Sequence, residues 1–542
     1  MAVTGRWTRR QWLRHSTRAG LASWWSMTGH ISAVEAAEQQ NDSDRARRVY
    51  FGDLHNHNAV GYAKGSLQRT FEIARNHLDF FAFTPHGWWP DIGHYEKGIE
   101  KKWLDGFEVT RQHWPDVLEM VRRFDKPGMF VAIPGFEWHS TFLGDYHILF
   151  PRVDAAEYVR INDLRHFQAF AKERGAIMIP HHPANRAGHR GANLKWRDPE
   201  VSPVIEIFSE WGCAEHDRAP SPYIRHTEAG RWTRNTLQYY LAQGHRLGVV
   251  ASTDDHLGYP GAYRQGLAAV WANELTREAI FDALRHRRTY AVSGDRIELD
   301  FRVNGRMMGE ELPYVPERRL RVAVEGWDQV DRVEVLKNNR VIHRDFPMDR
   351  LPGSTSWDEP VAVRFEWGWG PWPALDMTRT CDWEIHIRLE GGKLVDFQPC
   401  FVTGPLDEKR RDRVVAHSDR HLRIQSFTAL RQQFEDYSQK GVVLKVLGGP
   451  DTRISVQLTS PTRVSLTRTF RQLTECNEML FTGEFPKESA MLHRLVFADN
   501  YRTSFELTDT DGGETDTWYY VRVVQANEQF AWSSPIWVDA RA

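Results

Sequence analysis

The sequence has little cysteine, no excess of charge of one sign and no long hydrophobic run. Its four cysteines show no CxxC spacing, so a zinc site built from thiolates is not expected. The formal net charge of −2 does not indicate a protein that binds nucleic acids or membrane surfaces through its overall charge. No segment approaches the roughly 20 apolar residues of a membrane-spanning helix. A metal site in this chain would therefore depend on imidazole and carboxylate ligands.

Length and composition indicate a chain with more than one hydrophobic core. At 542 residues, two or three domains are expected, and a hydrophobic content of 41% is sufficient for their cores. Tryptophan is abundant, with 22 residues, which either pack in cores and sheets or line an aromatic cleft. Cys381 and Cys400 fall in one β-rich stretch and could form a disulfide after export; the sequence leaves this open.

The N-terminal residues have the features of an export signal. Residues 8–14, TRRQWLR, resemble a twin-arginine motif, and a weak apolar segment follows at 19–34. Small residues at 33–37 offer a cleavage site. We expect a signal segment at 1–37, a polar linker at 38–48 and a periplasmic or secreted location; a disordered basic leader is the alternative.

The spacing of apolar residues divides the rest of the chain into two regions. From residue 49 to 295, short apolar runs alternate with helical spacing, which predicts an α/β domain with a barrel-like sheet. Helices are expected at residues 67–79, 116–124, 164–174, 236–244 and 277–288. From residue 296 to 542, period-two alternation between Gly, Asn and Asp turns predicts a β-rich region of one or two sandwich-like units. Residues 405–515 are the least clear part of this region.

Residues of the types that bind metals lie at the ends of the apolar runs in the first region. They are His55, His57, His86, Glu137, His147, His181, His182, Asp254 and His256. Each run is typical of a buried strand of about five to seven residues. In folds built from βα units, the carboxyl ends of the strands converge on one mouth. The sequence therefore predicts one site with several imidazoles and at least two carboxylates.

The spacing of these residues suits two divalent ions. His55 and His57 are two apart and leave a strand on the same face, so both can hold one ion, and Asp254 and His256 share this spacing. Imidazole with carboxylate suits zinc, manganese or iron. Glu137 can bridge two ions through its two oxygens. Two such ions can hold a shared hydroxide as nucleophile and stabilise charge on a phosphoryl oxygen.

The ordered set of motifs resembles the PHP superfamily, named for polymerase and histidinol phosphatase domains. The matching segments are DLHNH at 53–57, TPH at 84–86, GFE at 135–137, YHILF at 146–150, IPHHP at 179–183 and TDDH at 253–256. The resemblance covers roughly residues 49–292. Within the superfamily, the chain is similar to an uncharacterised PHP-like group in which a β-rich tail follows the barrel, through the segments GDLHNHN, SGDRIELDFRVNG and AWSSPIW.

This resemblance implies a distorted (β/α)7 barrel and a metal-dependent hydrolase. It implies that one ion is held by His55, His57, Glu137 and Asp254. It implies that a second ion, bridged by Glu137, is completed by His86, His147, His182 and His256. The loop at residues 58–64 lacks the acidic or histidine residue of many relatives, so two ions are expected rather than three. Pro85 stands where relatives have an Asp, which removes a possible partner of a ligand.

Two histidine assignments rest on strand geometry. Adjacent strand residues face opposite sides, so only one of His181 and His182 is expected to be a ligand, and His182 is preferred because it precedes Pro183. His139 is two residues after Glu137 and could reach the same face, but a place beside the ligands or at the rim is the preferred interpretation.

Several residues near the expected mouth could contact a substrate. Arg190 is expected to bind a phosphate oxygen through its guanidinium, with Arg186 and His189 in the same loop, although a solvated loop is the alternative. His216 and Arg218 are similar candidates. Glu210 could be a general acid or the end of a strand, and Trp88 and Trp89 could form an aromatic wall or pack in the core.

Taken together, the motifs predict a phosphoesterase that acts on a small-molecule phosphoester through a metal-bound hydroxide at a dinuclear site. Glu137, Asp254 and Arg190 are the expected catalytic residues. No nucleic-acid partner and no membrane span are indicated. The alternatives are a metal-dependent hydrolase of an amide, lactone or carboxyl ester, since fold does not determine reaction, and a non-catalytic module whose β-rich tail binds a polymer.

Overall fold

The structure is a computed structural model that describes residues 47–223, 230–353, 355–369, 379–402, 406–430 and 439–541. The expected signal segment at 1–37 and all but the last two residues of the expected linker lie outside the described residues. Among the described helices, none is both long and apolar enough to cross a membrane. The four cysteines are free thiols, of which Cys476 is exposed and the others buried.

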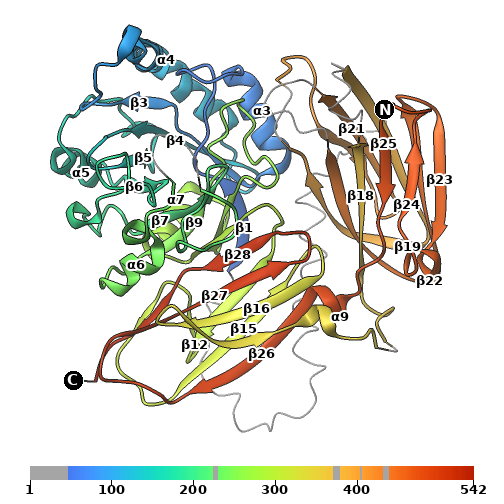
Figure 1. Cartoon of the computed structure of the whole chain (residues 1–542). Helices are drawn as coiled ribbons and strands as arrows, with labels where there is room; N and C mark the ends of the chain where they lie inside the picture. The colour runs from blue at the N-terminus through green and yellow to red at the C-terminus, as the bar shows by residue number, and fades with distance from the viewer. Residues whose placement is uncertain are drawn as a thin grey trace.

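The first region is a mixed α/β unit, drawn in blue to green in Figure 1. Its strands are β1 (Arg48–Asp53), β2 (Phe80–Phe83), β3 (His86–Trp88), β4 (Val131–Trp138), β5 (Asp145–Leu149), β6 (Ile177–His181), β7 (Val204–Ser209), β8 (Gly212–Cys213), β9 (Gly248–Ala251), β10 (Leu267–Ala272) and β11 (Thr289–Val292). Its helices are α3 (Leu67–His77), α4 (Glu100–Phe124), α5 (Leu164–Glu173), α6 (Leu237–Ala242) and α7 (Arg277–Arg285). Short 3-10 turns are η1 (Glu96–Gly98), η2 (Leu194–Trp196) and η3 (Thr233–Asn235).

Three of these helices begin at side-chain caps. The Ser66 hydroxyl accepts a hydrogen bond from the Arg69 amide, so α3 begins at the next residue. Asp163 caps α5 and Thr276 caps α7 in the same way. Each cap satisfies backbone N–H groups that have no partner inside the helix. The apolar faces of these helices are buried, which fixes them against the sheet.

The strands of the first region are not all parallel. β1 pairs with β2, and β2 with β4, in parallel register, whereas β5 is antiparallel to both β4 and β6. β7 and β9 form a separate parallel pair. A single bridge between Asn56 and Asp255 joins the ends of β1 and β9. The closed seven-stranded barrel stays a prediction; the observed pairing is a mixed sheet with a parallel pair beside it.

The β-rich region contains two units. The first consists of β12 (Glu298–Val303), β13 (Arg306–Met307), β14 (Glu311–Leu312), β15 (Arg318–Glu325), β16 (Val330–Lys337), β17 (Arg340–Asp345), η4 (Pro347–Asp349), α9 (Ala498–Tyr501), β26 (Arg502–Asp509), β27 (Thr517–Gln525), β28 (Phe530–Ser533) and β29 (Ile536–Val538). The second consists of β18 (Val361–Trp369), β19 (Arg379–Cys400), β20 (Arg413–His417), β21 (His421–Leu430), β22 (Lys440–Ser460), β23 (Val464–Thr469), α8 (Phe470–Leu473), β24 (Glu478–Phe481) and β25 (Ser489–Leu492). The second unit is thus inserted between two strands of the first.

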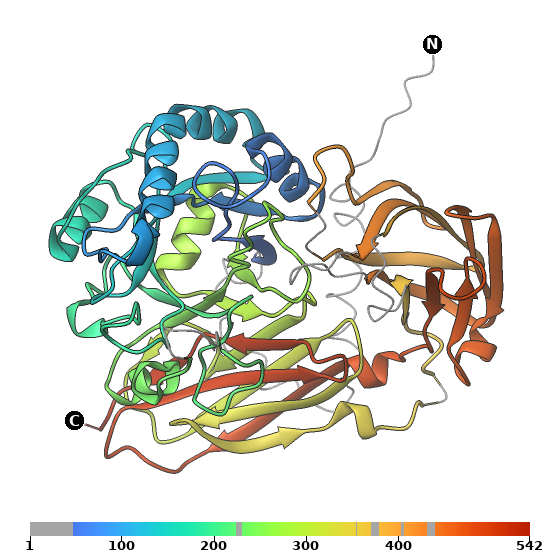
Figure 2. The ribbon, with the colours of Figure 1, turned by 45° about the horizontal axis from the view of Figure 1, so that its top comes forward.

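The α/β unit and the first β unit share a sheet and a core. β11 pairs antiparallel with β28, so one sheet of 14 strands runs through both units. One hydrophobic cluster includes Phe51 and Tyr290 together with Val521 and Ala531 from the end of the chain. The second β unit lies beside the other two units in both ribbon views (Figures 1 and 2), and its hydrophobic cluster also includes Ile73, Tyr259 and Ala262 of the α/β unit.

Candidate metal centre

Strand register places three of the expected ligands in one row. His86 of β3 lies opposite Glu137 of β4, and Glu137 lies opposite His147 of β5. On the next strand, His181 lies opposite Asp145. The row is completely buried, since each of these side chains is at most 2% exposed.

The bridge between β1 and β9 brings the HxH pair beside the TDDH segment. The Asp254 amide donates to the His55 carbonyl at 2.9 Å, and the His57 amide donates to the Asp255 carbonyl at 3.0 Å. Asp53 holds the two segments together, because its carboxylate accepts hydrogen bonds from the hydroxyl and amide of Thr253. It also accepts from the amides of His55 and Gly261. Burial raises the pKa of Asp53 to about 7.

The side chains of four residues meet at distances close to those of a tetrahedral metal site. We call His55, His57, Glu137 and Asp254 the ligand quartet. The His57 Nε2 lies 3.3 Å from the His55 Nε2, 2.8 Å from an Asp254 oxygen and 3.5 Å from a Glu137 oxygen. The His55 Nε2 lies 3.3 Å from Asp254 and 3.9 Å from Glu137. Tetrahedral zinc with bonds of 2.0–2.2 Å requires ligand atoms about 3.3–3.6 Å apart. The quartet therefore fits one divalent ion.

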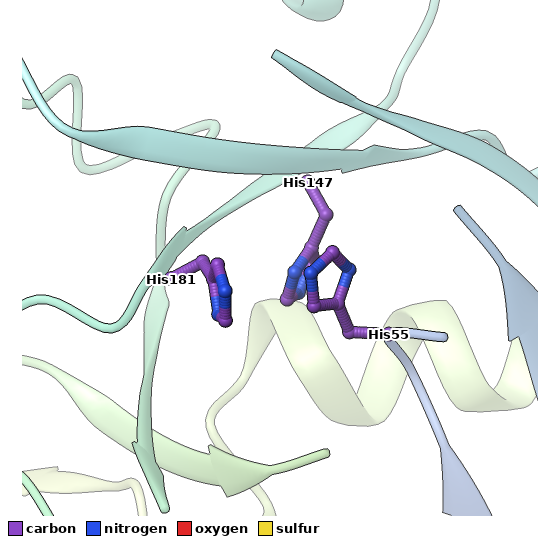
Figure 3. A group of neighbouring side chains, drawn as sticks. All are labelled: His55, His147 and His181. Carbon is purple, nitrogen blue, oxygen red and sulfur yellow. The ribbon is translucent and has the colours of Figure 1, made fainter. Parts of the chain in front are cut away.

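Two further groups of potential ligands flank the quartet. His57, His86 and His256 lie together on one side. On the other side, the rings of His55, His147 and His181 point toward one another (Figure 3). His147 is fully buried, and neither of its ring nitrogens has a hydrogen-bond partner among the described residues. A buried polar atom without a partner is costly, and a metal ion would satisfy it.

The residues expected to share the second ion are divided between these two sides. His86 and His147 lie on opposite sides of Glu137 in the row across β3, β4 and β5. Neighbouring strands are about 4.8 Å apart, so these two residues are separated by roughly 10 Å along the sheet. His86 and His256 accordingly group with His57, and His147 groups with His55 and His181.

Both His181 and His182 reach the centre. His181 Nε2 lies 3.0 Å from an Asp254 oxygen, and its Nδ1 lies 2.8 Å from Glu206. His182 Nε2 lies 3.3 Å from Asp145. The two rings are only 3.9 Å apart because the backbone of His182 turns to a positive φ of 25° immediately after β6. The rule of alternating faces therefore ends at His181 and does not restrict the centre to one of the two residues; the preference for His182 rested on Pro183.

Burial and neighbouring charges set the protonation of the quartet. Burial lowers the pKa of His57 well below its usual value and lowers that of His55, so both imidazoles are neutral. Burial raises the pKa of Glu137 well above its usual value. For Asp254, burial alone would raise the pKa, but the charge of His181 and hydrogen bonds from His181 and His55 hold it well below its usual value. The neutral imidazoles of His55 and His57 and the carboxylate of Asp254 are in the form that binds a metal, whereas Glu137 would release its proton when an ion binds.

Arg190 is at the centre, but its charge is paired. Its guanidinium donates to the fully buried carboxylate of Asp145, and it lies 5.0 Å from the ring of Trp89. The same Nη2 lies 3.3 Å from the His139 Nδ1, which is itself 3.4 Å from a Glu137 oxygen. His139 thus reaches the centre, where it forms a further group of potential ligands with Glu137 and Asp145. Arg186 and His189 are exposed in the same loop.

Three further residues at the centre had no separate role in the sequence argument. Glu206 orients His181, and its signal was a carboxylate inside an otherwise apolar strand. The Trp211 indole N–H donates to Asp254. Tyr62 stacks on His86 with ring centroids 3.5 Å apart. Neither aromatic contact had a sequence signal, because each joins segments distant in the chain.

The other candidates for substrate contact lie in different places. Glu210 is at the rim, with Oε1 3.4 Å from the His256 Nδ1, and burial raises its pKa to about 8. His216 lies at the junction with the first β unit, where its Nε2 is 3.4 Å from Arg522 of β27. Trp88 lies under Arg160. Trp89 packs near His139 and is largely buried.

Comparison with known proteins identifies relatives of unknown function. A family described as "Protein of unknown function (DUF3604)" matches residues 262–312, which span β10 to β14. Uncharacterised proteins of Chlamydia pneumoniae and Chlamydia trachomatis are 27% and 30% identical over 267 and 268 residues. Each match covers 44% of this chain and 43% of the relative, so the chain matches less than half the length of these relatives.

Two solved structures are also similar to the chain. One is a two-domain protein from Bacteroides vulgatus containing a predicted PHP-like metal-dependent phosphoesterase, with 11% identity, a TM-score of 0.29 and coverage of 78% of this chain and 96% of that one. The other is the lesion-specific endonuclease EndoQ from Pyrococcus furiosus, with 13% identity, a TM-score of 0.27 and coverage of 44% and 56%. TM-scores this low carry no argument about arrangement or activity, so the case for a metal centre depends on the side chains described above.

Proposed function

We propose that this protein is a metal-dependent phosphoesterase that uses two divalent ions, zinc, manganese or iron, to hydrolyse a small-molecule phosphate ester. The observation that carries the proposal is the ligand quartet, whose two imidazoles and two carboxylates meet at 2.8–3.9 Å in a buried environment, close to the spacing of a tetrahedral site. The order and spacing of the PHP motifs support phosphate as the substrate group.

The quartet would hold the first ion. The second would be held beside it by His147 and His181, because His147 otherwise has two unsatisfied ring nitrogens, and Glu137 lies next to both sides. His182 and the group of His86 and His256 complete the walls of the site. When bound, such ions lower the pKa of water and neutralise charge on a phosphoryl oxygen.

The remaining residues would position the ligands and supply a proton. Glu206 orients His181, and the Trp211 indole and His181 both hold Asp254. Glu210 remains protonated at neutral pH because burial raises its pKa to about 8, and it lies at the rim beside His256. A protonated carboxylic acid at the rim can give a proton to the leaving group.

A second candidate is a metal-dependent hydrolase of an amide, lactone or carboxyl ester. The observation that favours it is the pairing of Arg190 with Asp145, which neutralises the guanidinium expected to bind phosphate. The same ligand quartet would serve these substrates, since an activated water attacks a carbonyl carbon as well as phosphorus.

The experiment that tests the proposal measures metals and turnover on the same preparation. Elemental analysis gives metal per chain, and a panel of aryl phosphate monoesters and diesters, an aryl carboxyl ester and a short DNA oligonucleotide is assayed with added manganese or zinc. Two ions with hydrolysis of a small phosphate ester support the proposal. Two ions with turnover of the carboxyl ester alone favour the second candidate.

His57→Ala is the matched variant for this experiment, because His57 belongs to the quartet and also to the group with His86 and His256. We expect it to lose metal and activity while the β-rich region stays folded, as judged by limited proteolysis. A His57→Ala protein with the metal content and turnover of the wild type would contradict the proposal.

A further inference from the structure

The loop after the HxH pair inserts a tyrosine into the metal centre. Tyr62 lies between β1 and α3, and its ring is stacked on His86 with an interplanar angle of 22°. The Lys64 amide donates to the His256 carbonyl at 2.9 Å, which ties this loop to the TDDH segment. The loop at residues 58–64 contains no carboxylate and no imidazole. Tyr62 is its only aromatic residue.

The protein is built to accommodate this ring. Gly106 lies inside α4, and a Cβ atom there would come within 2.9 Å of Tyr62 Cδ1 and 3.0 Å of its Cβ. Glycine in a helix interior costs about 1 kcal/mol relative to alanine, so its presence here requires a reason such as this close approach. Lys102, also of α4, lies 5.7 Å from the centroid of the same ring. Tyr62 is therefore held between His86 and α4.

The ring of Tyr62 lies at the centre, close enough for the charged groups there to act on its hydroxyl. The charged groups that act on it are those of Glu137, Arg190, Asp145 and Asp254. Within the part of the chain that the structure describes, no hydrogen bond joins this hydroxyl to another residue. Asn58, the polar residue at the start of this loop, already forms two hydrogen bonds. Its side-chain amide donates to the Thr70 hydroxyl, and its side-chain oxygen accepts from the Val60 amide. Tyr62 is half-buried, so its ring is held in the centre while its hydroxyl is available to a bound molecule.

We propose that Tyr62 is a substrate-binding catalytic residue, whose phenol donates a hydrogen bond to a phosphoryl oxygen of the substrate. The inference rests on the proposed phosphoesterase function and assigns this residue a role within it. An ordinary phenol is protonated at neutral pH, so it can donate a hydrogen bond to an anionic oxygen. A donor fixed by packing before the reaction needs no reorganisation when charge develops on that oxygen. Stacking on His86 and the room left by Gly106 provide this fixation.

The test compares Tyr62→Phe with wild type in three measurements: metal per chain, affinity of the metal-loaded protein for inorganic phosphate, and kcat and KM for an aryl phosphate ester. Phenylalanine keeps the ring and its stacking and removes the hydroxyl alone. We expect unchanged metal content, phosphate affinity weakened and kcat/KM lowered by about 10- to 100-fold, as for a hydrogen bond to a charged group. Tyr95→Phe, which removes a phenol from a residue 43% exposed outside the centre, is the control and should match wild type.

The outcomes separate this inference from the proposed function. Unchanged phosphate affinity and turnover in Tyr62→Phe would overturn the role of Tyr62 while leaving the phosphoesterase intact. Loss of metal from Tyr62→Phe would also overturn it, because Tyr62 would then be a ligand. A wild-type protein that binds phosphate without hydrolysing any ester, and more tightly than Tyr62→Phe does, would remove the proposed function and keep Tyr62 as an anion-binding residue. Wild-type protein that neither binds phosphate nor hydrolyses an ester would overturn both.

Discussion

At the scale of single residues, the metal centre depends on which nitrogen of each imidazole faces a carboxylate. His181 illustrates this, because its Nδ1 is held by Glu206 and its Nε2 meets Asp254. A carboxylate behind a histidine fixes the ring and its tautomer, which strengthens metal binding at the other nitrogen. His182 has a different environment, with Asp145 at its Nε2 and the Asn185 amide 3.3 Å from its Nδ1.

These environments predict that the two adjacent histidines differ in importance. We expect His181→Ala to lose at least one ion per chain, because His181 contacts a member of the ligand quartet and belongs to the group with His147. His182→Ala should retain more metal. Elemental analysis after equal exposure to zinc measures the difference, with His113→Ala on the exposed face of α4 as control. Greater loss from His182→Ala would contradict the assignment.

Much of the centre could be predicted from residue spacing, and the exceptions have physical causes. His55 and His57 lie on one face because strand residues two apart do so. The expectation that only one of His181 and His182 is a ligand extended that rule past the end of β6, where His182 takes a positive φ, and the preference for His182 rested on Pro183. The pairing of Arg190 with Asp145 joins residues 45 apart in the chain, and no local pattern reports such a contact.

At the scale of elements, helix starts were predictable where a capping side chain is present. Ser66, Asp163 and Thr276 cap helices that begin at the expected residues. The helix expected at 116–124 instead begins at Glu100 and contains Pro115 in its interior. Proline is best tolerated in the first turn of a helix, but the buried face formed by Phe107, Trp114 and Val117 runs across Pro115, so the helix extends toward its N-terminus and still ends at Phe124.

The same helix provides a test in which local stability and function oppose each other. Gly106→Ala should raise the helix propensity of α4 by about 1 kcal/mol. The added Cβ must displace Tyr62, so we expect lower turnover of a phosphate ester with metal content unchanged and no gain in thermal midpoint. Activity assays and thermal unfolding measure both effects.

Glu119→Ala on the exposed face of α4 is the matched control for Gly106→Ala, and it should leave both activity and metal content at the wild-type level. A Gly106→Ala protein that is more stable and fully active would show that Tyr62 can move without consequence.

At the scale of the whole molecule, the three units meet on one buried carboxylate. Asp295 accepts hydrogen bonds from Tyr263 of the α/β unit, Gln398 of the second β unit and Gln525 of the first. Asn527 donates to it as well, and Arg364 of β18 lies 3.5 Å away. The sequence motif SGDRIELDFRVNG contains this residue, but its partners lie up to 232 residues away. The insertion of the second β unit was unpredictable for the same reason, since strand pairing across such distances leaves no local pattern.

This network predicts a large effect of a single substitution on stability. Asp295→Ala leaves several buried donors and the Arg364 guanidinium without their acceptor, and we expect a loss of about 3 kcal/mol or more. Thermal unfolding should show a lowered midpoint or separate transitions of the units. Asp300→Ala, which breaks a partly exposed pair with Arg302, should cost about 1 kcal/mol or less. Equal effects of the two variants would contradict a structural role for the network.

The pairing of β11 with β28 has a consequence for how the chain matures in the cell. Val292 pairs with Ala531, so the edge of the sheet that carries the metal centre has no partner until nearly half the chain has been added by the ribosome. At synthesis rates of 5–20 residues per second, that edge stays open for about 12 to 48 s. An unpaired strand edge invites pairing with other nascent chains. That edge is therefore open to such pairing over this interval, and a ribosome that stalls after residue 292 leaves a fragment whose metal-binding half has an open edge.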